Sequence, residues 1–431
     1  MTTTARKPPA AEGSATIRQI LDSDGVVTFF QPILSARQRS VVGVEALSRG
    51  VIGVEALSRG NFAGRAPTGD LIPPMRLFEM ASAEGLTHDL ERACRSTAMR
   101  TFASLQRPDD LILFLNVTAS ALERDAGSVD ELLNETQKLN LSPRNIAIEI
   151  LESAFDDAGH LRSLLETFRS QGFLLVLDDV GVGYSNLDRI PLIKPDVLKL
   201  DRSLVADIEN DYHRQETFKA LVQLSRRIGT LVVAEGVETQ PQAICALELG
   251  ADLLQGFFLG RPEQSSTLVC TEATRRVGEL GRRYKAFMID RINQRKLQHR
   301  RFNIILNEIL CELTRSNFEE FDLVLGYIIT SYSNVECIYV LDESGAQVSS
   351  TVCNPRLPPR AKGVMFRPAP QGADHSLKEY YYVLLDVELQ KYTTDPYVSL
   401  ATGNLCRTIS TFFRDSRNNK MYILCIDVLC D

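Results

Sequence analysis

Short apolar runs alternate along the chain with longer segments in which apolar residues recur at helical spacing. The run from Leu174 to Leu177 is hydrophobic at every position, which is typical of a strand buried on both faces, as in a parallel sheet. Strand and helix alternate in this way over roughly 240 residues, which predicts an α/β fold, a TIM-like (β/α)8 barrel. Strands are predicted within 26–34, 110–116, 145–153, 174–178, 195–201, 230–239 and 251–262, and helices within 73–105 (with a break near Gly85), 131–141, 160–172 and 212–228.

Polar residues stand at the ends of these predicted strands. In a (β/α)8 barrel the C-terminal strand ends converge on one face, so these side chains are expected around one mouth. Taken singly, each has an ordinary explanation, such as a helix cap, a solvated edge or an ion pair. The residues are Glu45 or Glu55, Asn116, Glu149, Asp178, Asp179, Lys199, Glu235 and Gln255.

The adjacent carboxylates Asp178 and Asp179 are the strongest local signal. Side chains alternate across a strand, so both can serve one site only where the backbone turns at a strand end. Neighbouring like charges raise one pKa or bind cations. One amide, at least four carboxylates and one lysine on one rim would suit two divalent cations about 3.5–4 Å apart over a phosphodiester. Burial and metal proximity are expected to lower the pKa of Lys199, which would position or deprotonate a water.

A ten-residue tandem copy interrupts the first predicted hairpin. VVGVEALSRG (41–50) is followed at once by VIGVEALSRG (51–60), which differs at one position. This is far too short for a solenoid repeat, and it represents a recent duplication or an artefact. Only one copy can fill one strand position, so the other is looped out or forms an extra ribbon.

From about Thr271 the pattern changes to a long charged helix followed by short strands. Ile292, Phe302, Ile305, Ile309 and Leu313 recur at helical spacing, which predicts a connector that could pair two copies of the chain. Strands are then predicted within 335–351 (a hairpin turning at 343–345), 378–389 and 420–429. These elements predict a small α+β, sensor-like module in which residues 392–403 could line a pocket.

The composition limits the partners and the kind of metal site that can be expected of this chain. The 48 basic and 55 acidic residues give a net charge of −7, which argues against a broad surface for nucleic acid polymers or anionic membranes. No apolar run approaches a membrane span, and the first residues lack the core of a signal peptide, so a cytoplasmic protein is expected. The nine cysteines include no CxxC pair, which argues against zinc ribbons and redox pairs. Only five histidines occur, so an oxygen-rich Mg²⁺ or Mn²⁺ site is expected.

Seven motifs occur in a fixed order: EALSR, LNVTAS, EILES, DDVGVGYSNL, KLD, AEGVE and QGFFLGRP. This series, over roughly residues 26–265, resembles that of the EAL-domain phosphodiesterases, which hydrolyse the bacterial messenger cyclic di-GMP. A bare EAL tripeptide would carry no information, whereas the ordered series is specific. The resemblance implies a barrel whose first strand runs antiparallel to the others, dependence on Mg²⁺ or Mn²⁺, and the linear product pGpG.

The resemblance also implies roles for individual residues, carried over by motif position. Lys199 would hold or activate the water, and Glu152 would brace the loop at 178–187. Metal ligands would be Glu45 or Glu55, Asn116, Glu149, Asp178 and Asp179, with Glu235 close by or acting through water. Substrate contacts would be Gln31, Arg49 or Arg59, Asp201, Glu238 and Gln255, the arginine being suited to a phosphate.

Two features depart from the family pattern. Val180 and Val182 replace a usual Phe and a small polar residue, which removes no ligand. In the duplicated segment, the spacing from Gln31 to Glu45 (45 − 31 = 14) is that expected of the family and favours the first copy, Glu45 and Arg49. If neither copy were well seated, the barrel would bind nucleotide without cutting it.

The C-terminal part resembles PAS-like or Cache-like modules, through its sheet pattern and the segment TDPYVS. The expected organisation is a disordered tail (1–20), an EAL barrel (21–270), a connector helix (271–316) and a sensory domain with an unknown small ligand (317–431).

Three functions are consistent with these features. The first is a cyclic di-GMP phosphodiesterase that acts as a homodimer and is regulated by the sensory domain. The second is a non-catalytic cyclic di-GMP receptor, and the third is a purely structural barrel. The many carboxylates on one rim disfavour the third.

Overall fold

The structure, a computed structural model, describes residues 16–52, 70–117, 128–150, 158–181, 187–264, 266–359, 365–386 and 389–430. The chain divides into two compact units, residues 1–289 and 290–431. Within the described ranges, no helix is both long enough and apolar enough to cross a membrane.

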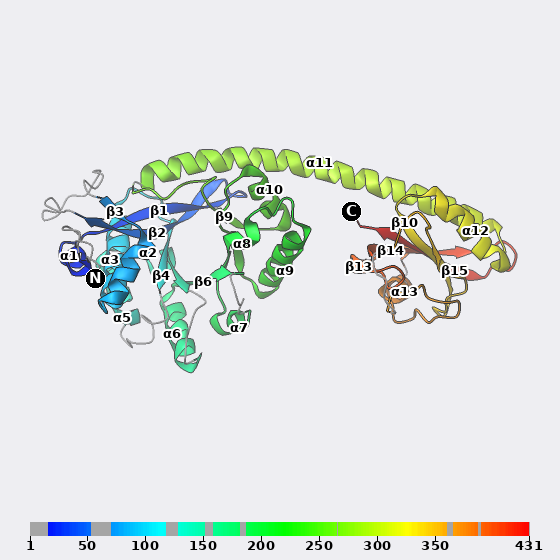
Figure 1. Cartoon of the computed structure of the whole chain (residues 1–431), viewed down its shortest axis with the longest axis horizontal. Coiled ribbons are helices and arrows are strands. Elements are labelled where there is room, and N and C mark those ends of the chain that lie inside the picture. The colour runs from blue at the N-terminus through cyan, green and yellow to red at the C-terminus, as the bar shows by residue number, and fades with distance from the viewer. Residues whose placement is uncertain are drawn as a thin grey trace, which may run out of the picture. The chain divides into compact units, whose positions relative to one another are not determined.

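The first unit is a closed barrel of eight strands with a short ninth strand, β3, at its edge (Figure 1). Closure comes from the pairing of β1 with both β2 and β9. Around the barrel the order is β1, β2, β4, β5, β6, β7, β8 and β9. The strands are β1 (Val26–Ser35), β2 (Ser40–Ile52), β3 (Asp70–Ile72), β4 (Ile112–Val117), β5 (Ile146–Ile150), β6 (Leu174–Val180), β7 (Val197–Leu200), β8 (Leu231–Ala234) and β9 (Leu253–Gln255).

The first strand runs against its neighbours, as the resemblance implied. β1 is antiparallel to both β2 and β9, whereas each neighbouring pair from β2 and β4 round to β8 and β9 is parallel. The register sets Gln31 opposite Glu45 and Ile33 opposite Gln255. The prediction of a TIM-like barrel with an antiparallel first strand is therefore confirmed.

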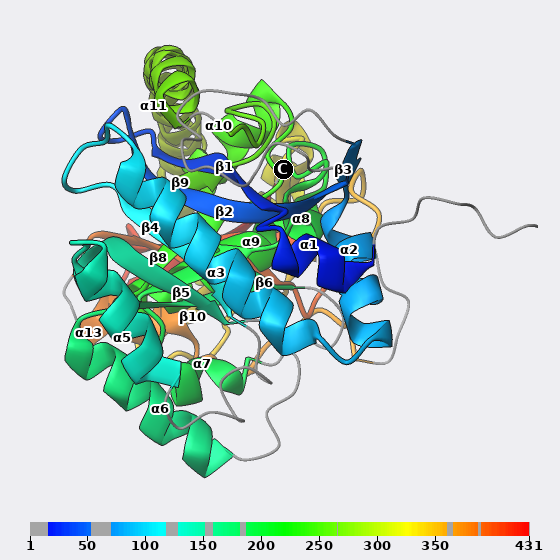
Figure 2. The same ribbon diagram turned by 90° about the vertical axis from the view of Figure 1, so that its left-hand side faces the viewer.

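Helices follow the strands and cover the outside of the barrel. Figure 2 shows α3, α5 and α6 on the outer side of the strands β4, β5 and β6. The break predicted near Gly85 lies between α2 and α3, where Gly85 has φ 70°. The helices are α1 (Ile17–Asp22), α2 (Pro74–Ala83), α3 (Thr87–Ser104), α5 (Ser128–Lys138), α6 (Ala158–Gln171), α7 (Arg189–Ile193), α8 (Arg202–Val205), α9 (Tyr212–Ile228) and α10 (Gln240–Leu249).

The predicted disordered tail is too long at its C-terminal end. Residues 17–22 form α1, which Thr16 caps by accepting a hydrogen bond from the Gln19 N–H. Ile17 and Ile20 are fully buried against Leu77 and Leu90 of α2 and α3. The apolar pair is too short for a sequence pattern to reveal, but its burial orders the helix.

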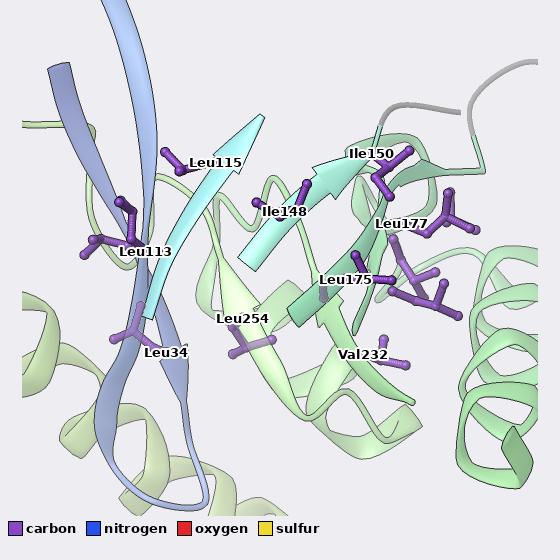
Figure 3. Close-up of a cluster of buried hydrophobic side chains, with 14 of the residues drawn as sticks. Leu34, Leu113, Leu115, Ile148, Ile150, Leu175, Leu177, Val232 and Leu254 are labelled. Carbon is purple, nitrogen blue, oxygen red and sulfur yellow. The ribbon is translucent and has the colours of Figure 1, made fainter. Parts of the chain in front are cut away.

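The barrel strands bury both faces. The outward side chains form one large apolar cluster with the surrounding helices; Figure 3 shows Leu113 and Leu115 of β4 beside Ile148 and Ile150 of β5. A second, smaller cluster consists of strand residues alone and therefore fills the barrel interior. Its buried members are Ile33, Phe114, Ala147, Val176, Val197, Val233 and Leu253. This interior layer is the floor beneath the polar residues at the strand ends.

Gly43 on β2 leaves the space that the Phe114 ring occupies. A Cβ at position 43 would lie 2.5 Å from that ring and 2.9 Å from the Ile112 carbonyl oxygen. We therefore expect Gly43→Ala to destabilise the barrel by about 1–3 kcal/mol through overpacking. The urea midpoint of unfolding measures this.

Gly278 provides the matched control, because a Cβ there meets nothing within 4 Å and the residue lies inside a helix. Gly278→Ala should stabilise that helix by up to about 1 kcal/mol. An unchanged or higher urea midpoint for Gly43→Ala would contradict the tight packing at β2.

The second unit is built on a six-stranded antiparallel sheet. Its order is β11, β10, β15, β14 and β12, with β13 also paired to β14. Its elements are α12 (Phe321–Ile328), β10 (Val335–Asp342), β11 (Val352–Cys353), α13 (Glu379–Asp386), β12 (Lys391–Thr393), β13 (Tyr397–Val398), β14 (Leu405–Arg414) and β15 (Met421–Leu429), together with the 3₁₀ helices η2 (Phe318–Glu320) and η3 (Ile329–Ser331). One further 3₁₀ helix, η1 (Pro143–Asn145), lies in the first unit. A PAS-like or Cache-like identity for this unit stays a prediction.

The strand predicted within 378–389 is wrong, since Glu379–Asp386 form the helix α13. Tyr380, Tyr381 and Leu384 lie at helical spacing and pack on Tyr339 and neighbouring residues of the sheet. A short run rich in tyrosine, valine and leucine suits either structure by composition, and tertiary packing decides.

The predicted connector forms one long helix, α11 (Ser266–Arg315). Part of the apolar stripe on this helix packs within the same chain, whereas the stripe was predicted to pair two copies of the chain. Ile309 and Leu313 are buried against the sheet of the second unit, and Phe302 and Ile305 pack on the same cluster. Ile292 is exposed. These contacts explain most of the stripe without a second copy of the chain.

Candidate metal and substrate site

The polar site lies one layer above the apolar floor of the barrel. On six strands, the polar residue follows a floor residue by two positions, and side chains two apart on a strand share a face. Both layers therefore face the barrel interior. The pairs are Phe114 and Asn116, Ala147 and Glu149, Val176 and Asp178, Val197 and Lys199, Val233 and Glu235, and Leu253 and Gln255.

Lys199 is the centre of this layer. Its Nζ lies 2.6 Å from Glu149 Oε1 and 2.7 Å from Glu235 Oε1. It also lies 3.2 Å from Asp178 Oδ1 and 3.3 Å from Glu45 Oε2. The lysine side chain is 1% exposed. One buried cation is thus shared by four carboxylates from β2, β5, β6 and the end of β8.

Glu45 comes from the first copy of the duplicated segment. Its carboxylate accepts hydrogen bonds from Asn116 Nδ2 at 3.2 Å and from Gln255 Nε2. Gln255 Nε2 also donates to Gln31 Oε1 at 3.3 Å, and Gln31 Nε2 donates to the Gly260 carbonyl at 3.1 Å. The structure therefore joins four of the predicted site residues in one hydrogen-bonded group.

Asp178 and Asp179 both approach the site because the strand is irregular between them. The register of β6 against β7 shifts between Leu177 and Val180, and Asp179 has φ 55°. The Asp179 N–H donates to Asp178 Oδ1 at 2.9 Å. A left-handed backbone at a non-glycine residue is costly, and such strain is common where a side chain must be redirected into a site. The turn expected at the strand end is thus a bulge within β6.

Carboxylates outnumber cationic groups around Lys199, and the pKa values of these carboxyl groups reflect the excess of negative charge. Burial, with neighbouring carboxylates, raises the pKa of Asp179 to about 6, and burial raises that of Glu235 to about 8 against the opposing effect of Lys199. Burial likewise raises the pKa of Glu149 and Asp178. For Glu45, Lys199 and its hydrogen bonds outweigh burial and lower the pKa.

The protein groups around Lys199 shift its pKa in the direction opposite to the expected lowering, and the effect of nearby metal stays a prediction. Burial does act to lower it, but the carboxylates of Glu149, Glu45, Asp178 and Glu235 together raise the pKa well above its ordinary value. Lys199 is therefore an ammonium group that donates hydrogen bonds. The sequence shows its burial but not how many carboxylates surround it.

The donor set fits hard divalent cations. Oxygens of Asp178, Asp179 and Glu235 all lie within 4.8 Å of one another. Glu149 Oε2 and Gln255 Oε1 are buried and have no hydrogen-bond partner among the residues that the structure describes, which suits both oxygens to act as ligands. Carboxylate and amide oxygens are what Mg²⁺ and Mn²⁺ prefer. Added positive charge would also offset the surplus of buried carboxylates.

Three predicted substrate residues lie outside the group around Lys199. Asp201 caps α8 by accepting a hydrogen bond from the Ser203 N–H at 2.7 Å, and it contributes to the raised pKa of Asp179. Glu238 pairs with Arg202 at 3.0 Å. The Arg49 guanidinium lies 4.8 Å from the centre of the Phe29 ring.

Arg202 was not identified from sequence, because an arginine that follows an aspartate at a helix start has no distinguishing pattern. Glu55, Arg59 and Glu152 lie outside the described residues, so their predicted roles stay predictions.

Comparison with known proteins decides the family. The EAL domain family matches residues 14–262, which is more than half of the chain. The chain belongs to the EAL domain family. The barrel strands and the acids at their ends lie within the matched residues.

Two curated relatives from Pseudomonas aeruginosa are similar over this domain. The bifunctional diguanylate cyclase/cyclic di-GMP phosphodiesterase MucR is 32% identical over 264 residues, 60% of this chain and 36% of MucR. The cyclic di-GMP phosphodiesterase NbdA is 32% identical over 252 residues, 57% of this chain and 30% of NbdA. The chain thus spans about a third of the length of these curated relatives.

The crystal structure of the Bacillus subtilis YkuI protein, which has an EAL domain and is in complex with substrate cyclic di-GMP and calcium, is similar over nearly the whole chain. Its TM-score is 0.76 at 23% identity, covering 97% of this chain and 100% of that one. This likeness is one of fold, and it extends to the C-terminal unit.

Proposed function

We propose that this EAL domain hydrolyses cyclic di-GMP to linear pGpG with Mg²⁺ or Mn²⁺. The observation that carries the proposal is that four carboxylates, those of Glu45, Glu149, Asp178 and Glu235, surround one buried lysine, Lys199, with the Asp179 carboxylate beside those of Asp178 and Glu235. Such a surplus of buried negative charge is costly unless cations share it. The names of MucR and NbdA support cyclic di-GMP as the substrate.

Each group has a proposed part in this reaction. Asp178, Asp179 and Glu235 would hold one cation, and Glu45, Asn116 and Glu149 the neighbouring one. When bound, the cations would stabilise the developing charge on the phosphate and make a water more acidic. Lys199, as an ammonium group, would orient that water by donating hydrogen bonds.

The other predicted residues would position the nucleotide. Gln31 and Gln255 lie beside Glu45, so their amides would contact the ligand at the edge of the cation site. Arg49 would pair with a phosphate oxygen after leaving the Phe29 ring. Asp201 and Glu238 would contact the nucleotide at the outer rim.

A hydrolysis assay with purified full-length chain tests the proposal. Incubation with cyclic di-GMP and Mg²⁺ or Mn²⁺ should yield pGpG, and EDTA should abolish the product until metal is added back in excess. Binding of cyclic di-GMP without cleavage under every metal condition would instead support the receptor function. Absence of both binding and cleavage would contradict each.

We further propose that the C-terminal unit regulates turnover through α11 and a homodimer, in response to a small ligand not yet identified. Ile289 and Ile292 on α11 are about half exposed, which leaves apolar surface for pairing. The ligand would shift α11, and with it the pairing of two barrels and the loop at 178–187. The same assay on residues 1–289 tests the regulation, and sedimentation of this fragment and of the full chain tests the pairing. Turnover equal to that of the full chain, together with the same number of chains per particle, would refute the proposal.

A further inference from the structure

Two cysteine thiols from neighbouring strands are in contact in the C-terminal unit. Cys337 of β10 faces Cys353 of β11 in antiparallel register, and their sulfur atoms lie 2.8 Å apart. Cys337 is fully buried, whereas Cys353 is partly exposed. A reagent from solution therefore reaches Cys353 first.

The backbone at this pair already has the dimensions of a disulfide. The Asn354 N–H donates to the Glu336 carbonyl at 2.8 Å, which makes Cys337 and Cys353 the adjacent non-hydrogen-bonded pair. Cα atoms at such a pair are about 4.5 Å apart. Disulfides usually span about 4.4–6.8 Å between Cα atoms, so a bond requires side-chain rotation and no backbone movement.

Hydrogen bonds hold β11 in place on both sides of Cys353. Ser350 donates its N–H and its hydroxyl to Asp322 of α12, at 2.7 and 2.8 Å. The buried Asn354 side chain donates to the carbonyls of Ile329, Tyr332 and Val335, at 3.3, 2.8 and 2.9 Å. The two sulfurs are thus kept together although β11 has only two residues.

The two thiols differ in acidity. A hydrogen bond from Cys337 lowers the pKa of Cys353. The same bond, together with burial and the carboxylate of Asp427, raises the pKa of Cys337. Asp427 lies opposite Cys337 on β15. Since the thiolate is the nucleophile, Cys353 is suited to attack, and the sulfur of Cys337, in contact with it, is placed to resolve.

We propose that Cys337 and Cys353 form a thiol–disulfide site that a hydroperoxide oxidises. The Cys353 sulfur attacks the peroxide, the O–O bond breaks, and a sulfenic acid forms while an alcohol or water leaves. The Cys337 sulfur then attacks the Cys353 sulfur. The S–O bond breaks, and hydroxide leaves with the Cys337 proton as water. The two thiols lose two electrons, which the peroxide gains.

Peptide mapping of the full chain tests the site without any variant. After treatment of reduced protein with hydrogen peroxide and alkylation, trypsin releases residues 316–356, which contain both cysteines and no internal Lys or Arg. We expect this peptide to have lost two hydrogens and to carry no alkyl group, and dithiothreitol to reverse both changes. A protease that cleaves after Glu343 should leave two fragments joined until reduction.

Variants separate the attacking and resolving roles. Cys337→Ser should leave Cys353 as a sulfenic acid that dimedone traps, and the exposed Cys311→Ser should form the disulfide as wild type does. The proposal is overturned if both cysteines of the 316–356 peptide remain alkylatable in wild-type protein under peroxide that oxidises Cys311. That result does not depend on whether Cys337→Ser folds.

Discussion

Glu45→Gln is expected to lower cyclic di-GMP hydrolysis about 100-fold, while Glu55→Gln leaves it near wild type. Glu45 accepts hydrogen bonds from Asn116 and Gln255 and lies 3.3 Å from Lys199 Nζ. The amide keeps the size of the side chain but loses its charge, so cation binding and the orientation of its neighbours both weaken. Initial rates of pGpG formation at saturating Mg²⁺ or Mn²⁺ measure the effect.

The pair of variants also assigns the duplicated segment. Both substitutions fall in the same ten-residue motif, so they differ in position and hardly in chemistry. Retained rates with Glu45→Gln and a large loss with Glu55→Gln would show that the second copy supplies the ligand. Circular dichroism and cyclic di-GMP binding verify that each variant is folded.

Lys199→Met is expected to destabilise the metal-free barrel by about 3–5 kcal/mol, because it leaves buried carboxylates without their cation. Glu149 and Glu235 lie 2.6 and 2.7 Å from the ammonium and lose this partner. Urea unfolding in the presence of a chelator measures the loss. Added divalent metal should restore part of the stability, since a ligand of the folded state raises it.

Lys219→Met is the matched control for this change. Lys219 lies 3.4 Å from Glu216 on the exposed side of α9, where such a pair contributes at most about 1 kcal/mol. Equal unfolding midpoints for the two variants would mean that the charges around Lys199 are not coupled in the way the distances indicate.

The sequence predicts the barrel well because hydrophobic residues follow different patterns along its strands and along its helices. The strand predicted to end at Asp178 and the helix predicted over 212–228 correspond to β6 and α9. The polar residues at strand ends follow from the same pattern, since topology alone brings such ends to one mouth. That step needs no knowledge of side-chain contacts.

Features that depend on tertiary packing could not be predicted from sequence patterns. The pKa of Lys199 depends on four carboxylates, three on different strands and one just after a fourth strand, and no local sequence rule brings them together. The helix α13 depends on the sheet beneath Tyr380 and Tyr381. The thiol contact joins cysteines 16 residues apart, so a search for CxxC spacing misses it.

The position of Glu45 has a local physical cause. β1 and β2 are joined by a short turn that pairs Ser35 with Ser40, and a register shift between Ile33 and Leu34 then sets Gln31 opposite Glu45. The turn and this shift together fix the register, and slippage is disfavoured because a shift of one residue would reverse the two faces of the strand. The hairpin therefore places Glu45, in the first copy, at the site.

The antiparallel first strand also affects how the chain matures on the ribosome. β1 completes its pairing only with β9, where Ile33 meets Gln255, so more than 200 residues must be synthesised before the ring can shut. Until then the nascent hairpin exposes an unpaired edge, a known template for mispairing between chains. Recruitment of chaperones during translation should therefore persist until the strand bearing Gln255 has left the exit tunnel.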